Sequence, residues 1–142
     1  MKLTYDDIFT FANTRETLVP NDKDFFAYKD AYERANILIK DLQKYIDIDL
    51  YNLLIKDLTI HYIITCDYTY DGEQNPLFVK YDIKEKSKGI ISSVSDEGSS
   101  ASLHINDALQ SLDFLGMDLI SSPYGKRAYA LLSQLNIIPI LL

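Results

Sequence analysis

The chain has 142 residues and a formal net charge of −7. This length suits one domain with a real core and is short for two. The acid excess excludes a general affinity for nucleic acid, which needs clustered Lys and Arg to displace counterions, but it does not exclude a protein past which DNA slides. The single cysteine, Cys66, excludes an internal disulfide and a cysteine-based metal site, and it fits a reducing, intracellular setting. The first residues lack the apolar segment of an export signal, so we expect neither export nor a membrane partner.

The first predicted helix covers residues 4–13. Thr4 followed three positions later by Asp7 is a capping-box pattern with the shorter acid. The apolar edge of this helix consists of Ile8, Phe9 and Ala12. Residues 14–20 end the helix, and Pro20 favours an extended approach to the next element.

A second helix is predicted between residues 25 and 46, because apolar residues recur there at steps of three and four. The stripe consists of Phe25, Tyr28, Tyr32, Ala35, Ile39, Leu42 and Ile46. It is either a coiled-coil seam or the inner face of a long helix that packs on its own domain. The shortness of the run favours the second interpretation. Asn21 or Asp22 is the expected cap.

Residues 50–65 form the segment around which we expect the chain to pack. The segment has no Gly or Pro and is apolar nearly all round, which is typical of a helix buried on several sides. It is too short and too interrupted by charges to span a membrane. Asp49 is its expected cap. Leu54, Leu58 and His61 are predicted core residues, and His61 is interpreted as a core imidazole bonded to a neighbour rather than as a base or ligand.

The pattern changes over residues 67–88. Asp71-Gly72 and Asn75-Pro76 are turn signals. The alternation of Leu77, Val79, Tyr81 and Ile83 with Phe78, Lys80 and Asp82 indicates one strand. A stretch of this length without a helix is more often functional or mobile than structural.

Residues 89–105 are predicted to form a β-hairpin, with strands at 90–95 and 101–105 joined by a turn that contains Gly98. A hairpin by itself is marginal in water, so it must lie on its own domain or on a neighbouring subunit. The residues that we expect to contact a neighbour are Ile91, Val94, Glu97, Ser100 and Leu103.

Two further helices are predicted before the apolar end of the sequence. Asn106 is the expected cap of a short helix interrupted near Gly116. Ser122 is the expected cap of the last helix, with Pro123 at the first helical position, where its missing N–H is harmless. The buried stripe of this helix is predicted to be Tyr124, Ala128, Leu131 and Leu135. Pro123, Tyr124 and Leu131 complete the predicted core.

Residues 137–142 include five large aliphatic side chains, which soluble monomers usually do not expose together. Pro139 favours an extended segment there. This tail can be buried on its own bundle or on an adjacent protein, and we favour the adjacent protein. The predicted contact residues are Ile138, Ile140, Leu141 and Leu142.

Together these elements predict a mainly α protein: a single domain over residues 1–142, built as a small helical bundle around a buried central helix, with an inserted β-hairpin. Neither His61 nor His104 belongs to an H-x-x-x-H pair, and the sequence has no C-x-x-C, G-x-S-x-G or P-loop motif. We therefore expect no metal, no cofactor and no enzymatic activity.

Three sequence blocks occur in a recognisable order. They are His61-Tyr62-Ile63-Ile64, the Ser-rich segment 89–105, and Ser122-Pro123-Tyr124-Gly125 followed by Tyr129. In this order and spacing, residues 4–135 resemble the head–tail connector (adaptor or head completion) proteins of tailed bacteriophages. The third block is the distinctive one. The charged segment 67–88 and the acid excess depart from the family pattern.

The resemblance implies a non-enzymatic virion protein, made in the host cytoplasm and located in the neck between capsid and tail. Such proteins form a ring, usually of twelve copies, that docks on the portal protein after DNA packaging. The ring extends the DNA channel, lets DNA pass without specific binding, and joins a tail protein or a second neck protein. Two alternatives remain open: a small intracellular module that binds and regulates a partner through the Tyr-rich helix, and an accessory subunit of an enzyme.

Overall fold

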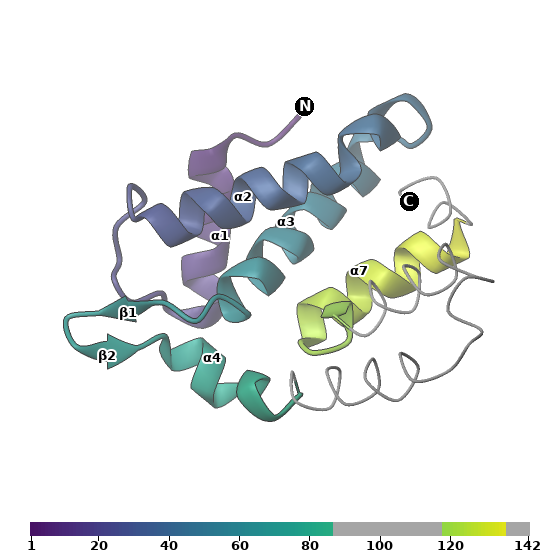
Figure 1. Cartoon of the computed structure of the whole chain (residues 1–142). Helices are drawn as coiled ribbons and strands as arrows, with labels where there is room; N and C mark the ends of the chain where they lie inside the picture. The colour runs from purple at the N-terminus through teal and green to yellow at the C-terminus, as the bar shows by residue number, and fades with distance from the viewer. Residues whose placement is uncertain (87–117, 136–142) are drawn as a thin grey trace, which may run out of the picture.

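The structure, a computed structural model, describes residues 1–86 and 118–135 (Figure 1). It is mainly helical, as the sequence predicts. Its elements are α1 (Tyr5–Glu16), α2 (Phe26–Ile39), the 3₁₀ helix η1 (Lys40–Lys44), α3 (Ile48–Ile64), β1 (Thr69–Tyr70), β2 (Glu73–Gln74), α4 (Pro76–Lys80) and α7 (Pro123–Gln134). No helix in these two ranges is long and apolar enough to cross a membrane.

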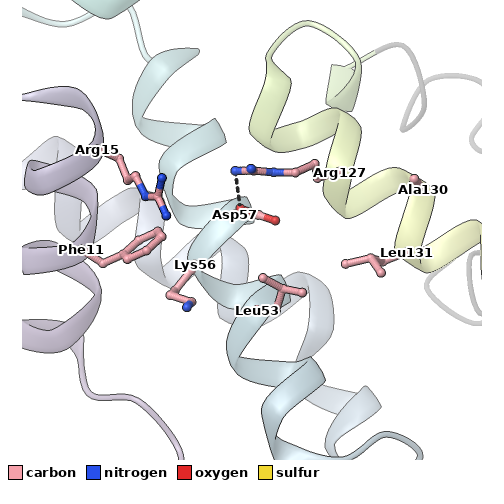
Figure 2. A pocket seen from close by; sticks show the side chains of 8 residues that line it. All are labelled: Phe11, Arg15, Leu53, Lys56, Asp57, Arg127, Ala130 and Leu131. Atoms are coloured by element: carbon pink, nitrogen blue, oxygen red, sulfur yellow. Dashed lines mark hydrogen bonds and ion pairs between the residues drawn. The ribbon is translucent and has the colours of Figure 1, made fainter.

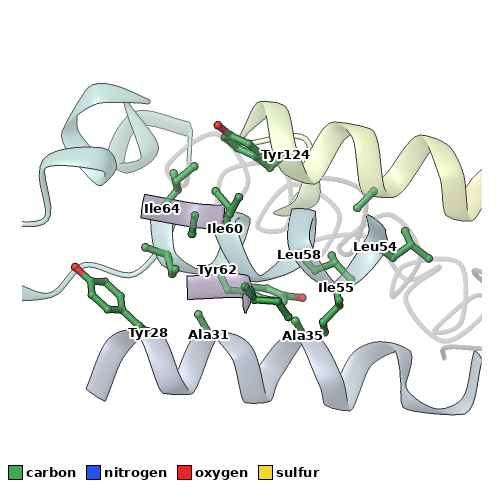
Figure 3. Packing of buried hydrophobic residues seen from close by; sticks show 14 of the residues in the cluster. Tyr28, Ala31, Ala35, Leu54, Ile55, Leu58, Ile60, Tyr62, Ile64 and Tyr124 are labelled. Carbon is green, nitrogen blue, oxygen red and sulfur yellow. The ribbon is translucent and has the colours of Figure 1, made fainter. Parts of the chain in front are cut away.

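Helix α3 is the centre of the fold. Helices α2 and α7 pack on opposite sides of it, and α1 packs on it as well (Figures 1 and 3). The side chains that α3 buries almost completely are Leu54, Ile55, Leu58, Ile60, Ile63 and Ile64. This burial confirms the prediction of a buried central helix. Burying one such side chain stabilises the folded state by about 1.5–3 kcal/mol relative to leaving it exposed.

Helix α1 begins as its capping box predicts. The Thr4 hydroxyl accepts from the Asp7 N–H at 3.2 Å, and the Asp7 carboxylate accepts from the Thr4 N–H at 3.1 Å. The backbone hydrogen bond from Thr4 lowers the pKa of Asp7. The helix continues to Glu16, past the predicted end, and stops where Thr17 adopts a left-handed φ of 41°.

Helix α2 differs from its prediction at both ends. Neither Asn21 nor Asp22 caps it: Phe25 is the N-cap without a side-chain bond, and Asp22 accepts instead from the N–H of Asp24 at 3.0 Å. The α-helix also ends at Ile39, where a 3₁₀ turn replaces the predicted continuation to residue 46. The inward face nevertheless packs on α3, as the second interpretation of the stripe requires.

The central helix begins at Ile48, with Asp47 as its cap. The Asp47 carboxylate accepts from the N–H of Leu50 at 2.8 Å. The expected cap, Asp49, lies in the first turn instead, where an acidic side chain faces the positive end of the helix dipole.

A short hairpin follows α3. Strands β1 and β2 pair antiparallel, with Thr69 opposite Gln74 and Tyr70 opposite Glu73. Asp71 and Gly72 form the turn with φ of 52° and 80°, the left-handed pair that a two-residue hairpin requires. The turn signal at Asp71-Gly72 is therefore confirmed.

The predicted strand over residues 77–83 is wrong, because residues 77–80 belong to α4 and residues 81 and 82 form a turn. Asn75 is buried and caps α4 by accepting from the N–H of Leu77 at 3.1 Å. Its amide nitrogen donates to the carbonyls of Ile63 at 2.9 Å and Cys66 at 2.8 Å. Asn75-Pro76 thus starts a helix attached to the end of α3, and this tertiary anchor outweighs the strand-like alternation.

Candidate functional site

His61 joins α3 to the beginning of α7. Its side chain is fully buried; Nδ1 lies 2.7 Å from the Ser122 hydroxyl and Nε2 lies 3.4 Å from the Asp118 carboxylate. The Ser122 oxygen accepts from the N–H of Gly125 at 3.0 Å, which leaves its O–H free to donate to His61 Nδ1. The prediction of a hydrogen-bonded core imidazole is confirmed.

In the block Ser122-Pro123-Tyr124-Gly125, the structure explains why the first residue is a serine and the last a glycine. Ser122 caps α7, as predicted. A Cβ on Gly125 would lie 2.0 Å from the carbonyl oxygen of Leu119 and 2.6 Å from His61 Nδ1, so no side chain fits there. The sequence pattern singled out the block but not this packing requirement, which involves a residue on another helix.

Two of the predicted core residues on α7 need correction. Pro123 is exposed, because the first position of the helix lies at the surface and proline acts there through its fixed φ rather than by burial. Leu131 is half-buried, Leu132 is fully buried, and Leu135 is exposed, so the inner face of α7 is rotated from the predicted stripe. Tyr124, Leu54 and Leu58 are buried as predicted.

Glu16 is a second junction, which sequence reasoning missed. Its carboxylate accepts from the Tyr124 hydroxyl at 2.8 Å, from Lys80 Nζ at 3.1 Å and from the Tyr81 hydroxyl. Burial acts to raise the pKa of Glu16, but these donors outweigh it and hold the pKa below its ordinary value. Burial and the bond to Glu16 raise the pKa of Tyr81 to about 12 and raise that of Tyr124 as well. One ionised carboxylate therefore connects α1, α4 and α7.

The sequence carries only a weak signal for Glu16. An acid at the last position of a helix faces the negative end of the helix dipole and is unfavourable there by itself. Such a position indicates a tertiary partner, but it does not say which one.

A pocket of about 420 Å³ opens between α1, α3 and α7 (Figure 2). Its lining consists of Phe11, Arg15, Leu53, Lys56, Asp57, Arg127, Ala130 and Leu131. Three of these are cations, one from each of the three helices. The surface therefore combines apolar side chains with positive charge, within a chain whose net charge is −7.

Asp57 is the single acid of this pocket. Its side chain is almost fully buried, and Oδ1 accepts from the Arg127 guanidinium at 3.0 Å (Figure 2). Oδ2 is buried without a hydrogen-bond partner. Burial raises the pKa of Asp57, against the opposing effect of Arg127. The lining therefore combines one carboxylate, bound to a guanidinium, with two further cations and with apolar side chains.

All of the predicted contact residues lie outside the described ranges. They are Ile91, Val94, Glu97, Ser100, Leu103, Ile138, Ile140, Leu141 and Leu142. The predicted hairpin at 89–105 lies there too, as does His104. Within residues 1–86 and 118–135, no group of three or more His, Cys, Asp or Glu side chains is placed to hold a metal ion.

No family model matches the chain, and no match was found among curated proteins or solved structures. What indicates a function is therefore the set of residues in the chain and the way the fold arranges them.

Proposed function

We propose that this protein is a structural component of the neck of a tailed bacteriophage. In this role it forms a ring that docks on the portal protein after DNA packaging, extends the DNA channel and joins the head to the tail or to a second neck protein. The observation that carries the proposal is that two sequence blocks behind the resemblance meet in space. His61 of the first block contacts Ser122 of the third, and Gly125 leaves room for that contact.

The charge of the chain supports the same role. A conduit must not hold DNA tightly, and affinity for DNA increases with every phosphate that a protein neutralises. A net charge of −7 per chain suits a lumen that repels the polymer passing through it.

The alternative function, a small module that regulates a partner through the Tyr-rich helix, has less support. Tyr28 on α2 is fully buried and donates to the carbonyl of Pro20 at 2.7 Å. Tyr32 on the same helix is partly buried against the core, and the centroid of its ring lies 5.2 Å from that of Tyr5. These side chains stabilise the domain itself and leave little of their surface to a partner.

The test of the neck role is reconstitution with the portal protein encoded in the same genome. We expect the chain to co-sediment with assembled portal and to appear in electron micrographs as an additional ring on the channel axis. A chain that ignores portal and instead forms a stoichiometric complex with a host protein would support the regulatory module.

Two deletions then test the predicted contacts that lie outside the described residues. Replacing residues 94–102 with a short Gly-Ser turn should leave the circular dichroism spectrum helical and prevent ring formation on the portal. Removing residues 137–142 should leave the melting temperature unchanged and abolish portal binding. A truncated chain that melts several degrees lower and still binds would place the tail in the core of its own domain.

A further inference from the structure

We propose that the pocket between α1, α3 and α7 receives the outer face of α2 from a second copy of this chain, so that copies join head to tail. This inference rests on the proposed function, because a ring needs a contact between two different faces of its subunit. It goes further by naming the two faces.

The lining of the pocket suits a partner surface that combines apolar side chains with negative charge. Lys56 Nζ lies 4.5 Å from the centroid of the Phe11 ring, and the Arg15 guanidinium lies 5.2 Å from the same centroid. Arg15 and Lys56 thus lie close to the Phe11 ring, whereas Arg127 lies against Asp57 (Figure 2). Leu53, in the same lining, is 42% exposed, which is a high value for a leucine on the central helix.

The outer face of α2 has the complementary composition. We define this face by Phe26, Asp30, Glu33 and Ile37, which follow one another at helical spacing and are all exposed. Phe26 is 60% exposed and Ile37 is 68% exposed. Two large apolar side chains therefore flank two carboxylates on one side of a regular helix.

The placement of the two faces permits head-to-tail association and prevents the α2 face of a chain from filling the pocket of that same chain. Helix α2 buries Ala31 and Ala35 against α3 and turns its outer face away from α3, whereas α7 lies on the opposite side of α3 (Figure 3). No residue of α2 lines the pocket. Each copy can therefore offer its pocket to one neighbour and its α2 face to another, which closes into a ring when the rotation between copies allows it.

Charge complementarity selects this partner over an apolar one. Contact between the two faces would set Asp30 and Glu33 beside Arg15 and Lys56, in a chain that otherwise repels its copies through its net charge of −7. Complementary charge across an interface fixes its register and suppresses wrong pairings. An unrelated acidic peptide in the pocket is the competing outcome of the test.

The experiment uses two single substitutions of exposed residues in the full chain: Leu53→Asp in the pocket and Ile37→Asp on α2. Light scattering over a concentration series reports the mass in solution, with unchanged melting curves as the fold control. We expect wild type to assemble and each variant alone to remain at the 16.3 kDa of one chain. We expect an equal mixture of the two variants to reach twice that mass and no more, because the intact pocket of one accepts the intact α2 face of the other.

The matched control is Val79→Asp, which alters an aliphatic side chain that is 61% exposed and belongs to neither face; it should assemble as wild type does. Wild type that stays monomeric up to about 1 mM, where even a weak association would be visible, overturns the inference. So does a mixture that stays monomeric. If only Leu53→Asp blocks assembly, another segment occupies the pocket and the assignment to α2 is wrong. Normal assembly of these copies without any binding to portal would instead overturn the neck role and leave this contact standing.

Discussion

His61 and Ser122 tie the central helix to the beginning of α7 through one buried hydrogen bond of 2.7 Å, and Gly125 provides the space for it. His61 lies far from the other two residues in the sequence. Its Nδ1 and the N–H of Gly125 both bond to the Ser122 hydroxyl. An unsatisfied buried donor or acceptor costs about 1–3 kcal/mol. Single substitutions at this junction should therefore have effects that are large for such small changes of side chain.

The first prediction is that Gly125→Ala destabilises the protein by about 1–3 kcal/mol, as overpacked sites do. At an open helical site the same change would stabilise by up to about 1 kcal/mol through helix propensity, so the sign of the effect is informative. Denaturant titration gives the free energy of unfolding. Lys126→Ala, an exposed position on the same helix, is the control and should stay within about 0.5 kcal/mol of wild type. A stabilised Gly125→Ala would contradict the close approach of Leu119.

The second prediction concerns Ser122→Ala. This change removes the cap of α7 and leaves His61 Nδ1 without its partner, so we expect a loss of roughly 1–3 kcal/mol in the free energy of unfolding. Ser133→Ala makes the same chemical change on the exposed side of α7 and should be nearly neutral. Equal effects of the two variants would argue against the junction.

At the scale of elements, α3 is stabilised by burial on several sides and α2 by its fit against α3. Helix α3 has apolar residues over nearly its whole circumference, whereas α2 buries three alanines, Tyr28 and Ile39 along a narrow face. Small residues on α2 let the two helices approach closely, and α2 needs no wider apolar stripe for that. The energetic weight of the core therefore lies on α3.

The third prediction compares two leucines of α3. Leu58 is fully buried, and Leu58→Ala should lower the free energy of unfolding by about 2–5 kcal/mol. Leu53→Ala removes the same atoms from a side chain that is 42% exposed and should cost well under half as much. Chemical denaturation of both variants measures the difference. Both variants are measured at a protein concentration at which wild type is monomeric, so that assembly does not cover Leu53. Similar losses would then mean that Leu53 is buried within its own chain.

At the scale of the whole molecule, Glu16 connects parts of the chain that are remote in sequence. It accepts from Lys80 and Tyr81 near α4 and from Tyr124, 108 positions away on α7. Because the pKa of Glu16 is lower in the folded state than its ordinary value of 4.5, its ionisation stabilises the fold above that pH. This stabilisation is lost as the pH falls through the folded pKa. Asp57 has a raised pKa and acts in the opposite direction.

The fourth prediction follows from this linkage. Glu16→Gln should lower the free energy of unfolding at pH 7 by roughly 1–3 kcal/mol, and its difference from wild type should shrink as the pH falls below 4.5. For Asp57→Asn we expect the opposite trend, with wild type gaining relative to the variant as Asp57 takes up its proton. Urea titrations at a series of pH values measure both. A difference between wild type and Glu16→Gln that does not change with pH would show that the Glu16 carboxylate is not held as described.

Features set by neighbouring residues were predictable from the sequence. The capping box at Thr4, the cap at Ser122, the turn at Asp71-Gly72 and the buried character of α3 all depend on residues within a few positions or on a repeating period. The interpretation of His61 as a bonded core imidazole also followed from its position on an apolar helix. What the sequence left open was the identity of its partners, Ser122 and Asp118.

By itself, then, the sequence determined that the chain is mainly helical, that α3 is buried and where α1 and α7 begin, because these depend on local hydrogen bonds and on the burial of a helix face. Only the tertiary structure decided the rest. Residues 76–80 form a helix rather than a strand because Asn75 caps them and binds the end of α3. Glu16 is ionised and buried because donors from two distant helices reach it, and the pocket exists because α1, α3 and α7 meet there. Each of these features depends on groups that are many positions apart in the chain and that only the fold brings together. A pattern of nearby residues does not show which distant groups will meet.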